Sequence, residues 1–218
     1  MKRLLFMAML TITGYAYAQK AYVASEKNYD VSYGSFPSSQ MGLYLPFNRT
    51  PETHFIIVIH GGGWVAGDKK GDRGSQQILM EQGIASANIN CRFVDSLYTH
   101  YQAMLADIDS AVNFCIAIAD KWHTRKTNFI FMGASAGGHL ALLYPYLTNR
   151  KVSAIIAECV SADLADTAML RYETSNGLLN IIKQNDRRYL FAGSANRSEI
   201  YDQQSCLSCT KYSDIDHS

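Results

Sequence analysis

Residues 129–139 read Phe-Ile-Phe-Met-Gly-Ala-Ser-Ala-Gly-Gly-His, and this stretch decides the fold. The run Phe129–Met132 is apolar and rich in aromatic side chains, which is typical of a buried strand. Residues 133–137 follow the pattern Gly-x-Ser-x-Gly, which forms a sharp turn between a strand and a helix. Glycine is needed on both sides of Ser135 because a Cβ there would collide with the turned backbone. The stretch therefore predicts a strand, a tight turn with Ser135 at its apex, and a helix.

A second glycine-rich stretch, residues 60–64 with the sequence His-Gly-Gly-Gly-Trp, follows the apolar run Phe55–Ile59. Such a loop lets the backbone approach a reacting carbonyl oxygen closely and offer it N–H groups. The candidate nucleophile is Ser135, and the candidate donors to the oxyanion are the amides of Gly62, Gly63 and Ala136. Taken alone, the glycines could form a flexible turn and the serine could be a helix N-cap. The two stretches together, in this order and each after a strand, favour the catalytic interpretation.

Residues 1–18 have the features of a cleaved signal peptide. A basic start at Lys2 and Arg3 precedes an apolar run over residues 4–12, and Ala16-Tyr17-Ala18 fits a cleavage site. The apolar run is too short to span a bilayer, so no stable membrane insertion is expected. We expect export to the periplasm or beyond the cell, and a mature single domain over residues 19–218.

Charge and cysteine usage narrow the classes of function. The net charge is +1 and no basic run occurs, so nucleic acid is not an expected partner. Cys91, Cys115 and Cys159 lie in apolar segments and are expected to be small buried hydrophobes. Cys206 and Cys209 form a lone Cys-x-x-Cys, which without a second pair favours neither a zinc site nor a redox site. The cysteines therefore predict neither a zinc site nor a redox site.

The remaining pattern predicts an α/β protein with a doubly wound, mainly parallel sheet. Strands are expected over residues 29–34, 41–46, 55–59, 84–93, 129–132 and 152–160, and helices over 75–82, 101–122 and 137–147. The first two strands are expected to form an antiparallel hairpin at the sheet edge. Gly83 should end the first helix, and Pro145 should kink or end the third.

These motifs resemble the exported carboxylesterase branch of the α/β-hydrolases, close to hormone-sensitive-lipase-like and feruloyl-esterase-like enzymes. The matching residues are Tyr44-Leu45-Pro46, 60–64 with Gly67-Asp68-Lys69, Asn90-Cys91-Arg92-Phe93, 109–112 and 133–141. The resemblance covers roughly residues 29–165. It implies the α/β-hydrolase fold and hydrolysis of small acyl or aryl esters through an acyl-enzyme, without metal or cofactor.

The catalytic acid and base are not assigned by the sequence. In this fold the chain order is serine, acid, histidine, and residues 164–218 contain no recognisable strand–acid or strand–histidine segment. Asp214, Asp216 and His217 qualify by residue type only. His60 is expected to brace the glycine loop, and His139 is expected to face away from the Ser135 hydroxyl. The sequence thus predicts a hydrolase domain that lacks its C-terminal strands and has weak esterase activity on its own.

Two other functions stay open at this point. One is a serine peptidase of the prolyl-oligopeptidase type, although the His-Gly-Gly-Gly loop favours an esterase and no propeller segment precedes the fold. The other is a non-catalytic or vestigial protein that keeps the pocket but lacks the base. The sequence specifies neither the particular ester nor the oligomeric state.

Overall fold

The computed structural model describes residues 22–94 and 101–160. The expected signal peptide, the Cys206–Cys209 pair and the candidates Asp214, Asp216 and His217 lie outside the described residues. Within the described residues, no helix is both long and apolar enough to cross a membrane.

Six strands of the described chain form one sheet in the order β1-β2-β4-β3-β5-β6. They are β1 Glu26–Ser32, β2 Gln40–Leu45, β3 Phe55–Ile59, β4 Ala85–Ile89, β5 Ile130–Ala134 and β6 Ala154–Glu158. β3 pairs in parallel with both β4 and β5, and β5 pairs in parallel with β6. β1 and β2 are the antiparallel hairpin at one edge. The predicted mainly parallel sheet with an edge hairpin is therefore confirmed.

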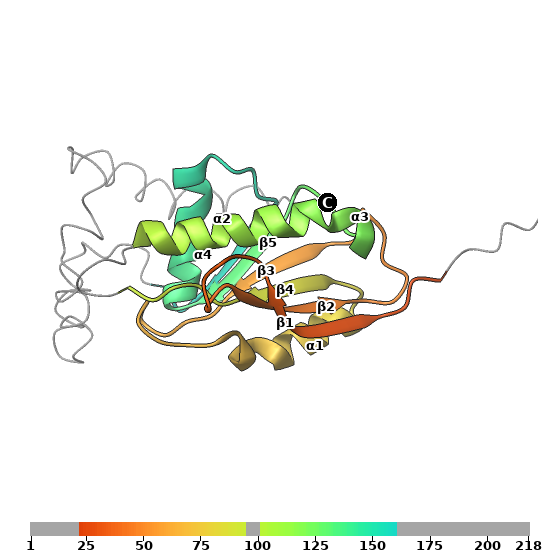
Figure 1. Ribbon diagram of the computed structural model, residues 1–218, viewed down its shortest axis with the longest axis horizontal. Coiled ribbons are helices and arrows are strands. Elements are labelled where there is room, and N and C mark those ends of the chain that lie inside the picture. Colours follow the sequence, from red (N-terminus) through yellow and green to blue (C-terminus); the bar gives the residue numbers. More distant parts are fainter. Residues whose placement is uncertain (1–21, 95–100, 161–218) are drawn as a thin grey trace, which may run out of the picture.

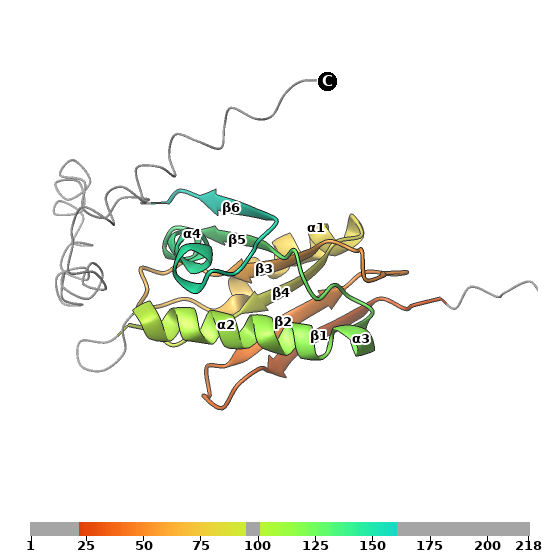
Figure 2. The same cartoon turned by 90° about the horizontal axis from the view of Figure 1, so that it is seen from above.

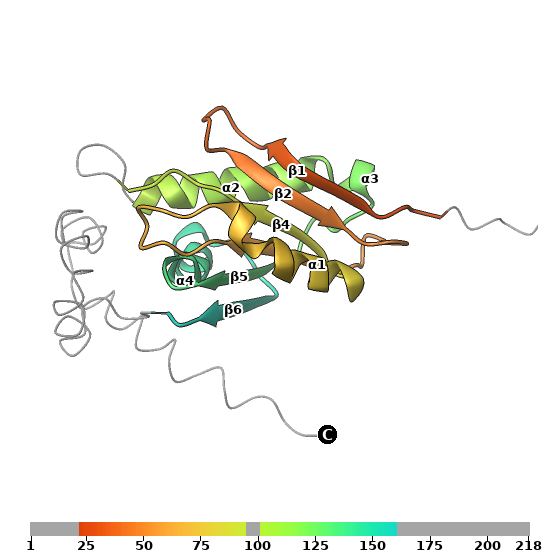
Figure 3. The same ribbon diagram turned by 90° about the horizontal axis from the view of Figure 1, so that it is seen from below.

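Helices cover both faces of this sheet (Figure 1). They are α1 Arg73–Glu81, α2 Tyr101–Ala117, α3 Ala119–Trp122 and α4 Ala136–Thr148, and a 3₁₀ turn, η1 Lys69–Asp72, precedes α1. α2 and α4 lie on one face (Figure 2), and α1 lies on the other (Figure 3). Because both faces are covered, every residue of β3 is buried, as its continuous apolar run predicts.

The packing of α2, α4 and β5 positions the turn after β5. The ring of Tyr144 on α4 packs against that of Phe131 on β5, with centroids 4.9 Å apart. The Tyr144 hydroxyl donates to the Asp109 carboxylate on α2 at 2.7 Å. Burial raises the pKa of Tyr144, so its hydroxyl stays neutral and remains a donor. The helix that follows the turn at Ser135 is thus anchored to two neighbouring elements, β5 and α2.

Two predicted strands were too long. The strand expected over 84–93 ends at Ile89, because beyond it the backbone is held by side chains: the Arg92 amide donates to the Asp107 carboxylate at 2.8 Å. The strand expected over 152–160 covers Ala154–Glu158 only, since Cys159 turns out of the extended conformation with a φ of 48°.

The helix boundaries also differ in detail. The helix expected over 101–122 is interrupted at Ile118, whose φ of −105° and ψ of 6° are not helical, so α2 and α3 are separate. α1 begins at Arg73, two residues before the expected start, and Gly83 follows its end with a φ of 77°, as predicted. α4 continues to Thr148, three residues beyond Pro145, and ends at Asn149 in a left-handed conformation.

The predicted burial of the cysteines is confirmed for two and wrong for the third. Cys91 and Cys115 are buried, and burial raises the pKa of each thiol to about 12. Cys159 is exposed. Cys159 follows β6, the last strand of the described sheet. At that position an apolar segment is not packed between neighbouring strands, so its residues can be exposed.

Candidate active site

Ser135 occupies a strained backbone conformation between β5 and α4. Its φ of 52° and ψ of −123° lie where residues other than glycine are rare. It holds the N-cap position of α4, but its side chain makes no capping hydrogen bond. Strain of this kind costs about 1–3 kcal/mol and persists where the surroundings impose it. The predicted strand–turn–helix is confirmed, and the role of Ser135 as nucleophile stays a prediction.

Backbone hydrogen bonds hold the strained turn on both sides. The Ser135 amide donates to the Glu158 carbonyl at the end of β6, at 2.8 Å. The Ser135 carbonyl accepts from the His139 amide at 3.0 Å, which begins α4. Ser135 itself is exposed, and among residues 22–94 and 101–160 no side chain hydrogen-bonds its hydroxyl. The hydroxyl is therefore accessible to a substrate.

The glycines beside Ser135 are required by close backbone contacts. A Cβ on Gly133 would lie 2.6 Å from the carbonyl oxygen of Gly137. A Cβ on Gly137 would collide with the carbonyl of Ile59 and would lie 2.6 Å from that of His60. The structure thus confirms that a side chain at either glycine would collide with the backbone. For Gly137 the colliding atoms belong to the end of β3, which the sequence did not indicate.

The glycine loop and Ser135 meet at the carboxyl ends of two adjacent strands. β3 and β5 are paired, with Ile59 opposite Gly133, so the residues that follow each strand share one edge of the sheet. A Cβ on Gly61 would lie 3.0 Å from the carbonyl oxygen of Ala134 and 3.5 Å from the Ser135 Cβ. This edge is where ligands bind in open α/β sheets.

The loop conformation depends on its glycines. Gly62 and Gly63 have φ values of 122° and 59°, which favour glycine. The Gly62 carbonyl accepts from the Val65 and Ala66 amides at 3.2 and 3.0 Å, which closes a tight turn. Ala136 is the first residue of α4, so its amide has no partner within the helix. Donation by Gly62, Gly63 and Ala136 to an oxyanion stays a prediction.

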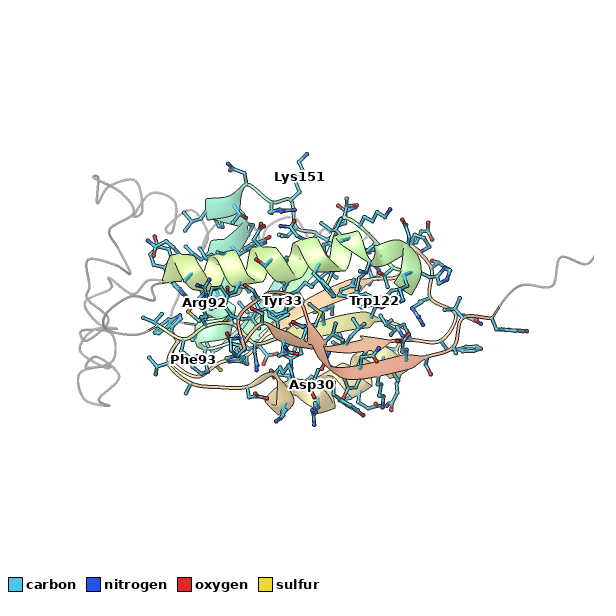
Figure 4. The ribbon with its side chains drawn as sticks, in the orientation of Figure 1. Asp30, Tyr33, Arg92, Phe93, Trp122 and Lys151 are labelled. Atoms are coloured by element: carbon cyan, nitrogen blue, oxygen red, sulfur yellow. The ribbon has the colours of Figure 1, made fainter. Side chains whose placement is uncertain are left out.

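His60 braces this loop, as its position predicts. Its Nδ1 donates to the Gly61 carbonyl at 2.7 Å, which leaves Nε2 buried and without a partner among the described residues. The His60 ring lies edge-on to that of Phe93, with centroids 6.1 Å apart. Figure 4 shows Phe93 and Arg92 together at the end of the molecule where the parallel strands finish.

A polar network ties the end of the loop to β4. The Asn90 side chain donates to the Asp68 carboxylate at 3.1 Å and accepts from the Lys69 amide at 2.6 Å. The buried Lys69 ammonium donates to the Asp30 carboxylate at 2.6 Å, and this bond lowers the pKa of Asp30. The family resemblance includes Asp68, Lys69 and Asn90, but sequence reasoning assigned them no role. In the structure they fix where the loop returns to the sheet.

A second ion pair, Arg92 with Asp107, was missed by the sequence analysis. The Arg92 guanidinium donates to both Asp107 oxygens, at 2.7 Å from Nη2 and at 3.0 and 3.1 Å from Nε. Asp107 is buried on α2 and also accepts the Arg92 amide. The one signal in the sequence is that Asp107 is a charged residue next to the apolar positions of the helix expected over residues 101–122.

We expect Asp107→Ala to lower the free energy of unfolding by about 1–3 kcal/mol, because it leaves the Arg92 amide and the partly exposed Arg92 guanidinium without their acceptor. Urea unfolding checks this. The matched control is Asp120→Ala, whose ion pair with Lys126 at 2.8 Å is exposed and should contribute less than about 1 kcal/mol. Equal losses in the two variants would contradict the expectation.

His139 is not placed as a base. It lies one turn after Ser135 on α4, is buried, and packs its ring against Trp64 with centroids 5.5 Å apart and an interplanar angle of 86°. Its Nδ1 has no partner among the described residues. Burial lowers the pKa of His139 to about 4, so the side chain is neutral at physiological pH.

We expect His139 to make the protein less stable in mild acid. Between pH 6.5 and about 4 the unfolded chain binds a proton at this position and the folded chain does not, so stability falls as the pH is lowered through that interval. The slope should approach about 1.4 kcal/mol per pH unit. Urea unfolding of wild type and His139→Asn from pH 8 to pH 4 measures it. The variant should show a smaller slope below pH 6.5, and equal slopes would contradict the expectation.

No group of three or more His, Cys, Asp or Glu side chains in the described part of the chain could hold a metal ion. The described residues bring an exposed hydroxyl, that of Ser135, to this edge beside the glycine loop. The comparison with protein families agrees with this geometry: the family model described as BD-FAE matches residues 41–188. The chain belongs to the BD-FAE family. Its members are α/β-hydrolase esterases.

Solved structures confirm the α/β-hydrolase fold of this BD-FAE member. Inhibitor-bound esterase B of Lactobacillus rhamnosis superimposes with a TM-score of 0.61 at 22% identity, covering 77% of this chain and 60% of the esterase. Carboxyl esterase 2 of Tuber melanosporum gives a TM-score of 0.56 at 24% identity, covering 77% and 56%. At these identities the likeness concerns the fold.

Two Arabidopsis thaliana proteins are similar in sequence. The probable isoprenylcysteine α-carbonyl methylesterase ICMEL1 is 29% identical over 128 residues, which is 59% of this chain and 26% of that protein. The isoprenylcysteine α-carbonyl methylesterase ICME is 26% identical over 136 residues, which is 62% and 31%. The chain thus spans about a third or less of these relatives.

Proposed function

We propose that this BD-FAE protein is a serine carboxylesterase in which Ser135 attacks small acyl or aryl esters. The observation that carries the proposal is the strained, exposed Ser135 packed against the glycine loop at the carboxyl ends of β3 and β5. Membership of an esterase family supports the same conclusion.

The reaction assigned to this site has two steps. The Ser135 oxygen bonds to the ester carbonyl carbon, its proton passes to a general base, and the carbonyl oxygen becomes an oxyanion next to the amides of Gly62, Gly63 and Ala136. The carbon–alkoxy bond then breaks, the base gives its proton to the alkoxy oxygen, and the neutral alcohol leaves. Water hydrolyses the acyl-enzyme and restores Ser135. No histidine in the described ranges is hydrogen-bonded to Ser135 Oγ, so the base is assigned to none of them.

A fluorophosphonate probe tests the proposal on the full chain. We expect one phosphonyl group per chain, located on Ser135 by peptide mass analysis, because the hydroxyl is exposed and, in the proposed reaction, passes its proton to a general base. Heat-unfolded protein should not react, and Ser153→Ala, which removes an exposed serine before β6, should react like wild type. Absence of labelling in the folded protein would favour the non-catalytic alternative.

A further inference from the structure

His139 has no role in the reaction proposed above, yet it lies beside Ser135 and contacts the residue that follows the glycine loop. Its amide donates to the Ser135 carbonyl at 3.0 Å, so it belongs to the first turn of the helix that carries the nucleophile. Its side chain is buried, and burial is the cause of its lowered pKa. A neutral imidazole on this helix can act on the site only through what its ring touches.

The ring touches Trp64, which directly follows Gly62 and Gly63. Trp64 has a φ of 65°, an unfavourable conformation for a residue with a large side chain, and is 6% exposed. Its carbonyl accepts the Val94 amide at 2.9 Å. A large residue stays in such a conformation where its surroundings hold it. The surroundings of the Trp64 indole include the edge-on contact with His139.

The two rings are not hydrogen-bonded to each other. Trp64 Nε1 and His139 Nδ1 are both buried and have no partner among the described residues. The contact between the helix and the loop is therefore one of ring packing, with the perpendicular arrangement that aromatic pairs favour.

We propose that His139 is a positioning residue, which holds the glycine loop against Ser135 through the ring of Trp64. The inference rests on the proposed function, because it concerns the donors of the same oxyanion site. His139 touches no reacting atom. If the contact is lost, Trp64 is free to relax from its strained conformation, and the amides of Gly62 and Gly63 move with it.

The first experiment is a double-mutant cycle of His139→Ala, Trp64→Leu and the double variant. Hydrolysis of p-nitrophenyl acetate is measured per fluorophosphonate-reactive site, so that unfolded protein does not count. Loss of oxyanion donors lowers kcat, so we expect each single variant to lose about 10- to 100-fold in kcat with little change in KM. Because both act through one contact, the double variant should be no worse than the worse single variant.

The second experiment reads the loop directly and does not need activity. The chain has two tryptophans, and Trp122 lies on α3, away from Phe93 and the strand ends (Figure 4). In a Trp122→Phe background, Trp64 is the only indole. We expect His139→Ala to shift its fluorescence emission to longer wavelength as the ring gains contact with water. His139→Leu, which retains side-chain volume, should give a smaller shift if His139→Ala folds poorly.

The two experiments separate the possible failures. If the wild type is not labelled on Ser135, the proposed function fails. The position of the loop is then judged from fluorescence alone: a shift of the Trp64 emission in His139→Ala supports the contact, and an unchanged emission overturns it. If the wild type is labelled, unchanged kcat in His139→Ala overturns the role. Multiplying losses in the double variant would also overturn it, because they would show that His139 and Trp64 act independently.

Discussion

Ser135→Ala is expected to abolish phosphonylation by the fluorophosphonate probe and to remove the part of p-nitrophenyl acetate hydrolysis that proceeds through the acyl-enzyme. The variant removes one oxygen atom from an exposed side chain that makes no hydrogen bond to another described side chain, so the fold should be unaffected. The loss would therefore be chemical. The measurements are the mass of the intact protein after labelling and the initial rate of ester hydrolysis.

The stability of the variant is its internal control. Urea unfolding of wild type and Ser135→Ala should agree, since the Ser135 side chain makes no capping hydrogen bond that the variant would lose and the strained φ remains. Persistent labelling in Ser135→Ala would show that another residue reacts with the probe. Unchanged hydrolysis would remove Ser135 from the mechanism.

Gly137→Ala is expected to lower the free energy of unfolding by about 3 kcal/mol. In an ordinary helix this change would stabilise by about 1 kcal/mol. Here the added Cβ would collide with the carbonyl of Ile59 and approach that of His60, and both atoms belong to the backbone at the end of β3. A backbone neighbour cannot rotate away as a flexible side chain can, so α4 and β3 must separate. The steric cost exceeds the gain in helix propensity.

Gly74→Ala is the matched control, since Gly74 also lies in the first turn of a helix. A Cβ there would meet nothing within 4 Å, so the variant should be more stable by about 0.5–1 kcal/mol. Because both variants gain the same helix propensity, a loss of stability in Gly137→Ala beside a gain in Gly74→Ala would be due to the contact between α4 and β3. Urea unfolding measures both, and a stabilised Gly137→Ala would refute the assigned contact. Labelling of Gly137→Ala should also slow, because the same movement displaces Ser135.

Much of this architecture can be predicted from short segments. The continuous apolar run Phe55–Ile59 predicts a strand covered on both faces, and the structure buries all five of its residues. The Gly-x-Ser-x-Gly pattern predicts the turn at Ser135, because only a sharp turn requires glycine on both sides. Boundaries were less accurate, since they depend on side chains from distant segments, as Asp107 shows at the end of β4.

The burial of individual side chains, and the contacts between residues far apart in the sequence, could not be predicted from short segments. Cys159 lies in an apolar run and is exposed, because cover depends on the order of strands in the sheet. The Lys69–Asp30 ion pair joins residues 39 positions apart, and no local pattern relates them. The contact between Trp64 and His139 exists only because β3 and β5 are neighbours.

The sequence by itself determined the elements and the candidate nucleophile, because strand periodicity and the glycine requirement of a tight turn act within a few residues. Only the tertiary structure decided which side chains support that nucleophile. The pairing of β3 with β5 brings the glycine loop to Ser135 and places a buried, neutral His139 against Trp64. Such contacts depend on how the strands are ordered, and strand order results from the packing of the whole sheet.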